Sequence, residues 1–558
     1  MVSHRNADVV LITGNVITIN PRWPRAEAIA IRGGKLIFVG KQDRAREFIG
    51  SKTEVWDLKG ATVVPGFNDA HTHTLLFGLN LLRTIDLTEV RSIDEIVHAV
   101  RERTQAQTAG TWILGFGYNH NELKEKRHPT RRDLDAAAPN HPVSLKHCAY
   151  HMQAINSKAL ALAGITRETL DPGSGKIGRD EATNEPTGVL YELPAIDLVE
   201  RVIPKPSREE LRSALKEANR RMIAEGITSA TDATGAGLID VPSQITAFRE
   251  AVAKGDLTVR HSLGIWSEGV VDFTRIHEGA EKIGQGMKRL GVRPGQGDER
   301  LRFGPLKIVA DGALTTATAA TYEPYGADPS HQSRGMLLID PLELRALVGA
   351  AVKRGWQVSI HSIGDRAIDA ALDAIEKACE VPKGKCRHRI DHCTITTETI
   401  LKRMNKLRVM AILQPGFIWE LGDGWIRQLG PDRAMRVKPF RTILDNGIVA
   451  AFSSDRPVIK NAAPLIGIHT AVNEKTMTGQ IFAQRESISP EEALRCYTLH
   501  GAYATFEENM KGSIQKGKLA DLAVLSDDPT RVPSEEIKDI KVRATIIEGQ
   551  VVYGDGSF

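Results

Sequence analysis

Residues 61–74 read ATVVPGFNDAHTHT, an apolar run that ends in two histidines. His71 and His73 stand two positions apart, and on a β-strand such residues face the same side. Both imidazoles would therefore point to one place at the carboxyl end of the strand, where barrel enzymes keep their active sites. Because an H-x-H pair alone is a short motif, its meaning depends on the rest of the chain.

Seven more strand-like runs follow before about residue 500, and amphipathic stretches such as RAIDAALDAIEKA (366–378) separate several of them. This alternation is typical of a parallel sheet covered by helices. Eight such strands predict an α/β fold with a TIM-type (β/α)8 barrel at 65–504. The interval after the first strand is too long for one crossover, so it should hold an inserted subdomain at about 110–205.

The two chain ends share a different pattern of short β-rich runs and turns, as in AEAIAIRGGKLIFVG (26–40) and VRATIIEGQVVYG (542–554). A few short strands alone are marginally stable, whereas ends that meet in space can complete one sheet. The pattern predicts a composite β-sandwich built from 1–64 and 505–558.

The composition limits the partners of the chain. Its 558 residues carry 73 Lys and Arg against 69 Asp and Glu, which leaves no strongly charged surface for nucleic acid or an anionic membrane. Five cysteines without a C-x-x-C pair fit a reducing compartment, and no apolar run reaches the length of a membrane span. We therefore expect a cytoplasmic protein with a small-molecule substrate.

Three other predicted strands end in side chains that bind metals. IHSIGD contains His361, RIDHC contains His392 and AAFSSD contains Asp455. A single histidine on such a strand is more often a core residue than a ligand, but several at equivalent strand ends favour a divalent metal site.

Lys307 lies within the apolar run GPLKIVADGA (304–313). A buried lysine is costly unless it is paired or chemically altered. One interpretation is an ion pair with Asp311, which would share its face of the strand. The other is a carbamate, formed by capture of carbon dioxide on the neutral amine, which can bridge two metal ions.

The chain resembles the metal-dependent amidohydrolase superfamily and, within it, the Amidohydro_3 branch, which includes N-substituted formamide deformylase. The matching stretches run along almost the whole chain: VVPGFNDAHTH, KIVADG, VSIHSIGDRAIDAALDA, RIDHC, SSDRPV and GSIQKGKLADLAVL. The resemblance implies a metal site made of His71, His73, Lys307, His361, His392 and Asp455. The resemblance leaves open whether one or two metal ions bind and whether Lys307 is carbamylated. It also suggests that the protein forms a homodimer.

These groups indicate hydrolysis of an amide-type C–N bond in an amide, formamide, carbamate or cyclic amide. A divalent ion lowers the pKa of its bound water toward about 7, and the resulting hydroxide can attack the carbonyl carbon. Asp455 is the expected base and proton donor, with His392 as the second catalytic candidate. Zinc suits these ligands best, although manganese, iron or nickel would also fit.

Other functions are compatible with the same residues. A deaminase of a nitrogen heterocycle would use the same hydroxide, and a lyase or decarboxylase would use the same metal. A non-catalytic regulatory protein of the same fold is the third alternative, although it would have no need of a complete ligand set.

The loops and the insertion should contact the substrate. The candidates are Tyr118, His151, Asp311, Gln414 and Trp419, and Trp425 offers a further apolar wall. The other histidines of the insertion, His120, His128, His141 and His147, are expected at its surface.

Overall fold

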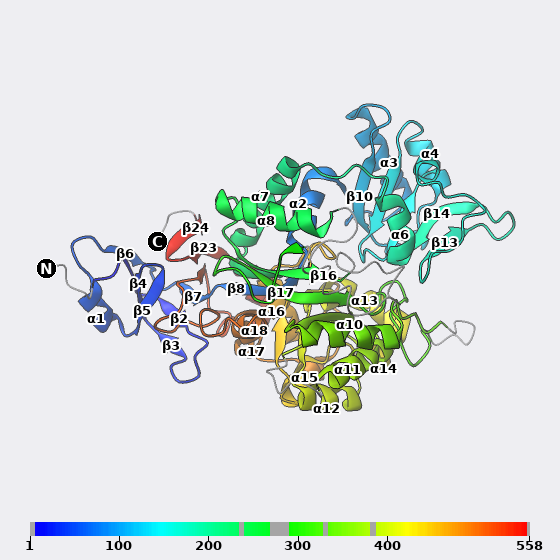
Figure 1. Cartoon of the computed structure of the whole chain (residues 1–558). Helices are drawn as coiled ribbons and strands as arrows, with labels where there is room; N and C mark the ends of the chain where they lie inside the picture. The colour runs from blue at the N-terminus through cyan, green and yellow to red at the C-terminus, as the bar shows by residue number, and fades with distance from the viewer. Residues whose placement is uncertain (1–5, 234–238, 268–289, 327–332, 380–386, 555–558) are drawn as a thin grey trace.

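The computed structural model in Figure 1 describes residues 6–233, 239–267, 290–326, 333–379 and 387–554. At its centre is an eight-stranded parallel sheet whose first and last strands are in contact, so that it forms a nearly closed barrel. Its strands, in order, are β8 (Phe67–Thr72), β15 (Ile227–Asp232), β16 (Arg260–Trp266), β17 (Leu301–Val309), β18 (Val358–Ser362), β19 (Arg389–His392), β20 (Met410–Leu413) and β21 (Ala450–Phe452). The predicted TIM-type barrel is confirmed.

Helices cover the outside of the barrel because each has one apolar face. In α11 (Asp365–Cys379), for example, the buried residues recur every three or four positions, as a core-facing stripe requires. The other main covering helices are α2 (Thr74–Arg83), α7 (Arg208–Ala224), α8 (Val241–Ala253), α10 (Pro341–Lys353), α12 (Glu398–Leu407), α13 (Gly416–Leu429), α16 (Pro464–Asn473), α17 (Pro490–Tyr497) and α18 (Leu499–Ala504). Within the described chain, no helix is long and apolar enough to cross a membrane.

The chain ends form two sheets that lie beside the barrel (Figure 1). One contains β5 (Lys35–Gly40), β4 (Ala28–Arg32), β1 (Val9–Ile12) and β6 (Glu54–Asp57); the other contains β24 (Gln550–Gly554), β23 (Val542–Ile547), β22 (Leu522–Leu525), β7 (Thr62–Pro65), β2 (Asn15–Ile17) and β3 (Arg25–Ala26). In the second sheet β7 pairs with β22, which comes from the other end of the chain. The two sheets share a buried apolar core, and the predicted composite sandwich is confirmed.

The insertion after β8 is a subdomain with its own sheet. The sheet contains, in order, β13 (Lys176–Arg179), β14 (Pro186–Tyr191), β12 (Met152–Ile155), β11 (Val143–His147), β10 (Ile113–Tyr118) and β9 (Ile85–Asp86). Four helices accompany it: α3 (Ile93–Gln105), α4 (Arg131–Ala137), α5 (Ser157–Leu162) and α6 (Glu192–Glu200). Two apolar clusters of its own stabilise this subdomain.

Candidate metal centre and substrate cavity

The structure brings all six predicted metal-binding residues to the wall of one cavity. Its empty volume is about 890 Å³, including the opening to solvent. The six side chains come from five barrel strands or the residues just after them: His71, His73, Lys307, His361, His392 and Asp455. Residues at the carboxyl ends of barrel strands therefore converge, as the sequence pattern predicts.

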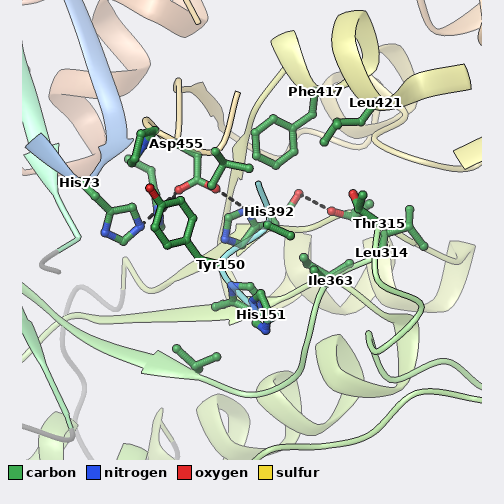
Figure 2. A pocket seen from close by; sticks show the side chains of 18 of the residues that line it. His73, Tyr150, His151, Leu314, Thr315, Ile363, His392, Phe417, Leu421 and Asp455 are labelled. Atoms are coloured by element: carbon green, nitrogen blue, oxygen red, sulfur yellow. Dashed lines mark hydrogen bonds and ion pairs between the residues drawn. The ribbon is translucent and has the colours of Figure 1, made fainter. Parts of the chain in front are cut away.

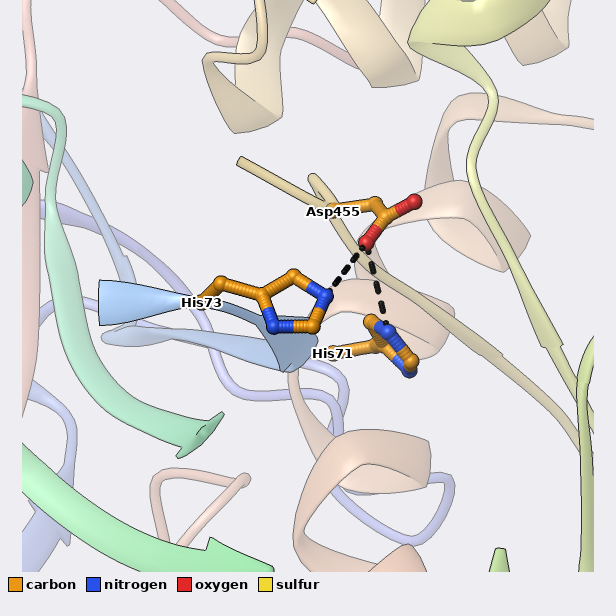
Figure 3. A group of neighbouring side chains, drawn as sticks. All are labelled: His71, His73 and Asp455. Carbon is orange, nitrogen blue, oxygen red and sulfur yellow. Dashed lines mark ion pairs between the residues drawn. The ribbon is translucent and has the colours of Figure 1, made fainter. Parts of the chain in front are cut away.

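Among the described residues, His71, His73 and Asp455 form a group whose ligand atoms lie close enough together to hold one metal ion (Figure 3). The Oδ1 atom of Asp455 lies 3.2 Å from Nε2 of His71 and 3.3 Å from Nε2 of His73. His71 is fully buried, yet neither of its ring nitrogens makes a hydrogen bond of normal geometry. Two imidazole nitrogens and a carboxylate oxygen that face one point form a donor set suited to a divalent cation.

His361 and His392 complete the histidine cluster. Their ring centroids are 4.4 Å apart, and the His392 ring lies 5.1 Å from that of His71. Burial lowers the pKa of both His361 and His392 well below the usual value of histidine. Both rings are therefore neutral, which is the form that binds metals.

The charge of Asp455 is maintained by its surroundings. Burial acts to raise its pKa, but the interactions with His71 and the hydrogen bond from His73 hold the pKa of Asp455 well below its usual range. The same contact acts on His73: burial opposes protonation, while the hydrogen bond and charge of Asp455 raise the pKa of His73 above its usual value. The site therefore presents an ionised carboxylate to the imidazoles.

The backbone at two strand ends aims these side chains. His392 has a φ of 72° and Asp455 a φ of 54°, both in the left-handed region that few non-glycine residues adopt. The amide of Asp455 donates to the carbonyl of His71 (2.8 Å), and the amide of His73 donates to the carbonyl of Arg456 (2.9 Å). These bonds tie the end of β8 to the loop that carries Asp455.

Asp391 is a buried residue in contact with two of the predicted ligands, and the sequence pattern did not single it out. Its Oδ2 atom lies 2.8 Å from Nζ of Lys307 and 2.9 Å from Nδ1 of His71, and its Oδ1 atom accepts from Nε of Arg389 at 2.9 Å. Burial acts to raise its pKa, but Arg389 and Lys307 hold the pKa of Asp391 well below the usual range. Asp391 precedes His392 in the RIDHC motif, and this position next to a predicted ligand is the one sequence feature that could have indicated it.

The ion-pair interpretation of Lys307 named the wrong partner. Lys307 pairs with Asp391, whereas the two carboxylate oxygens of Asp311 accept hydrogen bonds from the amides of Ile363, Gly364 and Ala320 at 2.8–3.0 Å. Asp311 is fully buried, and burial raises its pKa to about 7. It is not among the residues that line the cavity, and its hydrogen bonds join the loop after β17 to the loop after β18.

Three further substrate candidates also lie off the cavity wall. Gln414 is buried behind His392, where its Oε1 atom lies 3.1 Å from Nδ1 of that ring. Trp419 packs edge-on against His469 at 5.2 Å between centroids, and Tyr118 lies inside the insertion against His128. Of the five predicted substrate contacts, His151 is the one that lines the cavity.

The histidines expected at the surface of the insertion are in fact covered. His141 and His147 are buried, and His120 and His128 are partly buried. His120 bonds to His147 at 3.1 Å and stacks on His128. The prediction of a surface position was wrong because it rested on residue type alone, without the packing between strands and loops.

Most of the cavity wall is apolar (Figure 2). Trp425, one of the two predicted tryptophans, belongs to it, together with residues that the sequence did not single out: Leu76, Leu193, Trp266, Leu314, Ile363, Phe417 and Leu421. The polar atoms are concentrated at the histidine cluster. The cavity therefore suits a small molecule with one polar group and an apolar remainder.

Comparison with known proteins agrees with this geometry. A family model described as "Amidohydrolase family" matches residues 54–553. The chain is 33% identical to the putative amidohydrolase YtcJ of Bacillus subtilis, over 97% of this chain and 98% of that protein. It is 28% identical to N-substituted formamide deformylase of Arthrobacter pascens, over 98% of each chain.

Among solved structures, a metal-dependent hydrolase of Pyrococcus horikoshii has the same architecture. The match has a TM-score of 0.73 and 26% sequence identity, and it covers 94% of this chain and 99% of the other.

Proposed function

Because the chain belongs to the amidohydrolase family and is a hydrolase of carbon–nitrogen bonds, we propose that it cleaves a secondary amide that carries an apolar group on nitrogen. A formamide is the first candidate, and carbamates and cyclic amides are the next. The observation that carries the proposal is the convergence of His71, His73 and Asp455 at the polar end of an otherwise apolar cavity.

We propose zinc as the metal, held by His71, His73 and Asp455, with His361 and His392 as the ligands beside them. Nitrogen and oxygen donors of this kind suit zinc. When bound, the ion would supply an acidified water molecule and would polarise the carbonyl group. Buried His71 supports this assignment, because its Nε2 atom faces Oδ1 of Asp455 at 3.2 Å without a hydrogen bond of normal geometry.

Asp455 is proposed as the base that takes a proton from the attacking water. Its carboxylate is ionised and lies on the cavity wall, as a general base requires. His392 lies beside Asp455, with Nδ1 3.8 Å from Oδ2 of that residue. We propose that His392 helps to hold the amide carbonyl group of the substrate in place.

Lys307 is proposed as the site of a carbamate that would bridge a second ion. Burial lowers the pKa of its amine although Asp391 opposes the shift, so a larger fraction of Lys307 is neutral and able to capture carbon dioxide. About two ions per chain after expression with bicarbonate would support the bridge. About one ion would leave Lys307 as the plain partner of Asp391.

The apolar wall supports the choice of substrate. Phe417, Leu421 and Trp425 are contributed by α13, and Leu314 and Ile363 by the loops after β17 and β18. An aromatic or branched alkyl group fits such a surface better than a charged group does. The similarity to a protein named N-substituted formamide deformylase points in the same direction.

The experiment is a product assay on zinc-loaded protein with four substrate types. We would offer N-benzylformamide, N-benzylacetamide, a phenylcarbamate and a cyclic imide, and would measure the released amine or acid. Release from N-benzylformamide at the highest kcat/KM is the expected result. Ammonia release from nitrogen heterocycles, with no cleavage of the four amides, would replace the proposal by a deaminase.

A further inference from the structure

The inserted subdomain places a histidine–carboxylate pair at the mouth of the barrel. His151 directly precedes β12, and Glu192 directly follows β14. These strands are antiparallel neighbours, with Met152 opposite Tyr191, and the pairing extends one step further because the amide of Glu192 donates to the carbonyl of His151 at 2.7 Å. The register of the insertion therefore sets His151 and Glu192 face to face.

The side chains of the pair are bonded as closely as the backbones. Nδ1 of His151 lies 2.6 Å from Oε2 of Glu192, and both residues are buried. Since a carboxylate oxygen only accepts, Nδ1 carries the hydrogen in this bond. Nε2 is then the nitrogen that His151 offers to the cavity, whose wall it helps to form.

Glu192 has no other evident task within the described chain. Its second oxygen, Oε1, is buried and makes no hydrogen bond there. It lies so close to Gly312 that a Cβ atom at this glycine would stand 2.7 Å from Oε1. The carbonyl of Gly312 in turn lies 3.1 Å from Nε2 of His361, so the pair is packed against the loop beside the candidate metal centre.

The backbone of the pair is held in an uncommon conformation. Tyr150, just before His151, has a φ of 60°, and Glu192 has a φ of 63°. Left-handed non-glycine residues are unfavourable and persist where the surrounding structure enforces them, often at functional sites. Here the strand pairing and the contact with Gly312 supply that constraint.

His151 and Asp455 occupy different parts of the cavity. In the view of Figure 2 the His392 ring lies between them. Asp455 is engaged with His71 and His73 through Oδ1, at the polar end of the cavity. The His151 ring lies 5.6 Å from that of His361, on the side supplied by the insertion.

We propose that His151 is a catalytic residue that protonates the departing nitrogen, and that Glu192 is the positioning residue that holds its ring. This inference rests on the proposed amide hydrolysis and assigns separate groups to its two proton transfers. Asp455 removes a proton from water, and His151 delivers a proton to the amine.

The bond between the carbonyl carbon and nitrogen breaks, and its electron pair goes to nitrogen. His151 enters the step as an imidazolium, with Nδ1–H bonded to Glu192 and a second hydrogen on Nε2. The departing nitrogen takes the proton from Nε2, and the electron pair of that N–H bond stays on the ring. The hydroxyl of the water remains on carbon, and the proton that Asp455 removed returns to His151 through solvent.

The test compares two formamides that differ in their leaving groups. N-Benzylformamide releases a strongly basic amine that needs protonation, whereas 4-nitroformanilide releases a weakly basic one. We expect His151→Asn to lower kcat/KM for the benzyl compound by at least about 100-fold, within the range of general acid catalysis, and for the nitroanilide by less than about tenfold. Glu192→Gln should also lower kcat/KM more for the benzyl compound than for the nitroanilide, but the difference between the two losses should be smaller than in His151→Asn.

Two matched variants control for changes to the insertion. His141→Asn alters a buried histidine that bonds to the carbonyl of Thr111, and Glu200→Gln alters a buried carboxylate bonded to Lys146; neither lines the cavity. Both variants should keep the wild-type ratio of kcat/KM for N-benzylformamide to kcat/KM for 4-nitroformanilide. A second readout is ¹⁵N NMR of histidine-labelled protein without metal, in which Nδ1 of His151 should carry a proton that interacts with Glu192.

The outcomes separate the pair from the proposed function. Equal losses on both substrates in His151→Asn, or an unprotonated Nδ1, would overturn the assignment of the pair while amide hydrolysis stands. Wild-type protein that cleaves neither formamide nor any other amide would overturn the proposed function, and this inference with it.

Discussion

Asp455 is the residue on which the proposed chemistry depends most, because it contacts both histidines of the H-x-H pair and is ionised. Asp455→Asn keeps the size of the side chain but removes the base. We expect kcat to fall by at least about 100-fold at saturating zinc, which is the lower range of general base catalysis. The measurement is amine release, with circular dichroism as the check on folding; a near-normal rate would remove Asp455 from the mechanism.

Asp391 does not line the cavity but contacts two of the proposed metal-site residues, His71 through Nδ1 and Lys307 through Nζ. Groups that orient metal ligands in this way typically change metal affinity by 10- to 100-fold when they are altered. We expect Asp391→Asn to weaken zinc binding within about that range, measured by competition with a chelating dye on folded protein. Asp373→Asn, on the exposed side of α11, is the control; equal affinities in both variants would contradict this role.

For individual residues, the sequence allows prediction of the metal-binding side chains but not of the side chains that contact them. His71 and His73 follow from the period of a strand, and they do line one cavity. Asp391 and His392 are adjacent, so a regular strand would send them to opposite faces. The left-handed backbone of His392 breaks that alternation, and nothing in the local pattern signals it.

At the scale of elements, α2 and α7 pack so closely that a glycine is required between them. A Cβ atom at Gly78 would lie 1.9 Å from the carbonyl oxygen of Ala214, which is backbone and cannot move aside alone. Gly78→Ala should therefore destabilise the protein by about 1–3 kcal/mol, as overpacking does. The measurement is the midpoint of thermal unfolding.

Gly349 in α10 is the matched control for this substitution. Nothing lies within 4 Å of the position that its Cβ would occupy, and alanine is the better helix former. Gly349→Ala should leave the unfolding midpoint unchanged or raise it. A lower midpoint in both variants would show that the contact between α2 and α7 is not the cause.

The strands of the barrel could be predicted because each is a short apolar run with a turn signal after it. The contact between His151 and Glu192 could not, because these residues are 41 positions apart and meet only through the register of β12 and β14. Likewise, Phe417 and Leu421 appear in the sequence as ordinary apolar residues of a helix. Which of them face a cavity depends on how α13 packs on the barrel.

For the whole molecule, Arg260 links the barrel to the sandwich. Its guanidinium lies 2.7 Å from Asp521 and 3.1 Å from Glu548, and its side chain is only 2% exposed. Removal of one partner from a buried ion pair destabilises by about 3–5 kcal/mol. We expect Arg260→Met to lower the midpoint of urea unfolding while zinc content at low urea stays at the wild-type value; an unchanged midpoint would contradict a linking role.

The proposed amide hydrolysis depends on a divalent metal held by the histidine cluster and Asp455. The most direct test is formate release from N-benzylformamide by one protein sample, measured as prepared, after removal of metal by a chelator, and after zinc is restored. We predict that activity is lost on removal and recovers with zinc in proportion to the metal bound. Formate release that is unaffected by complete removal of metal would contradict hydrolysis by a metal held at this site.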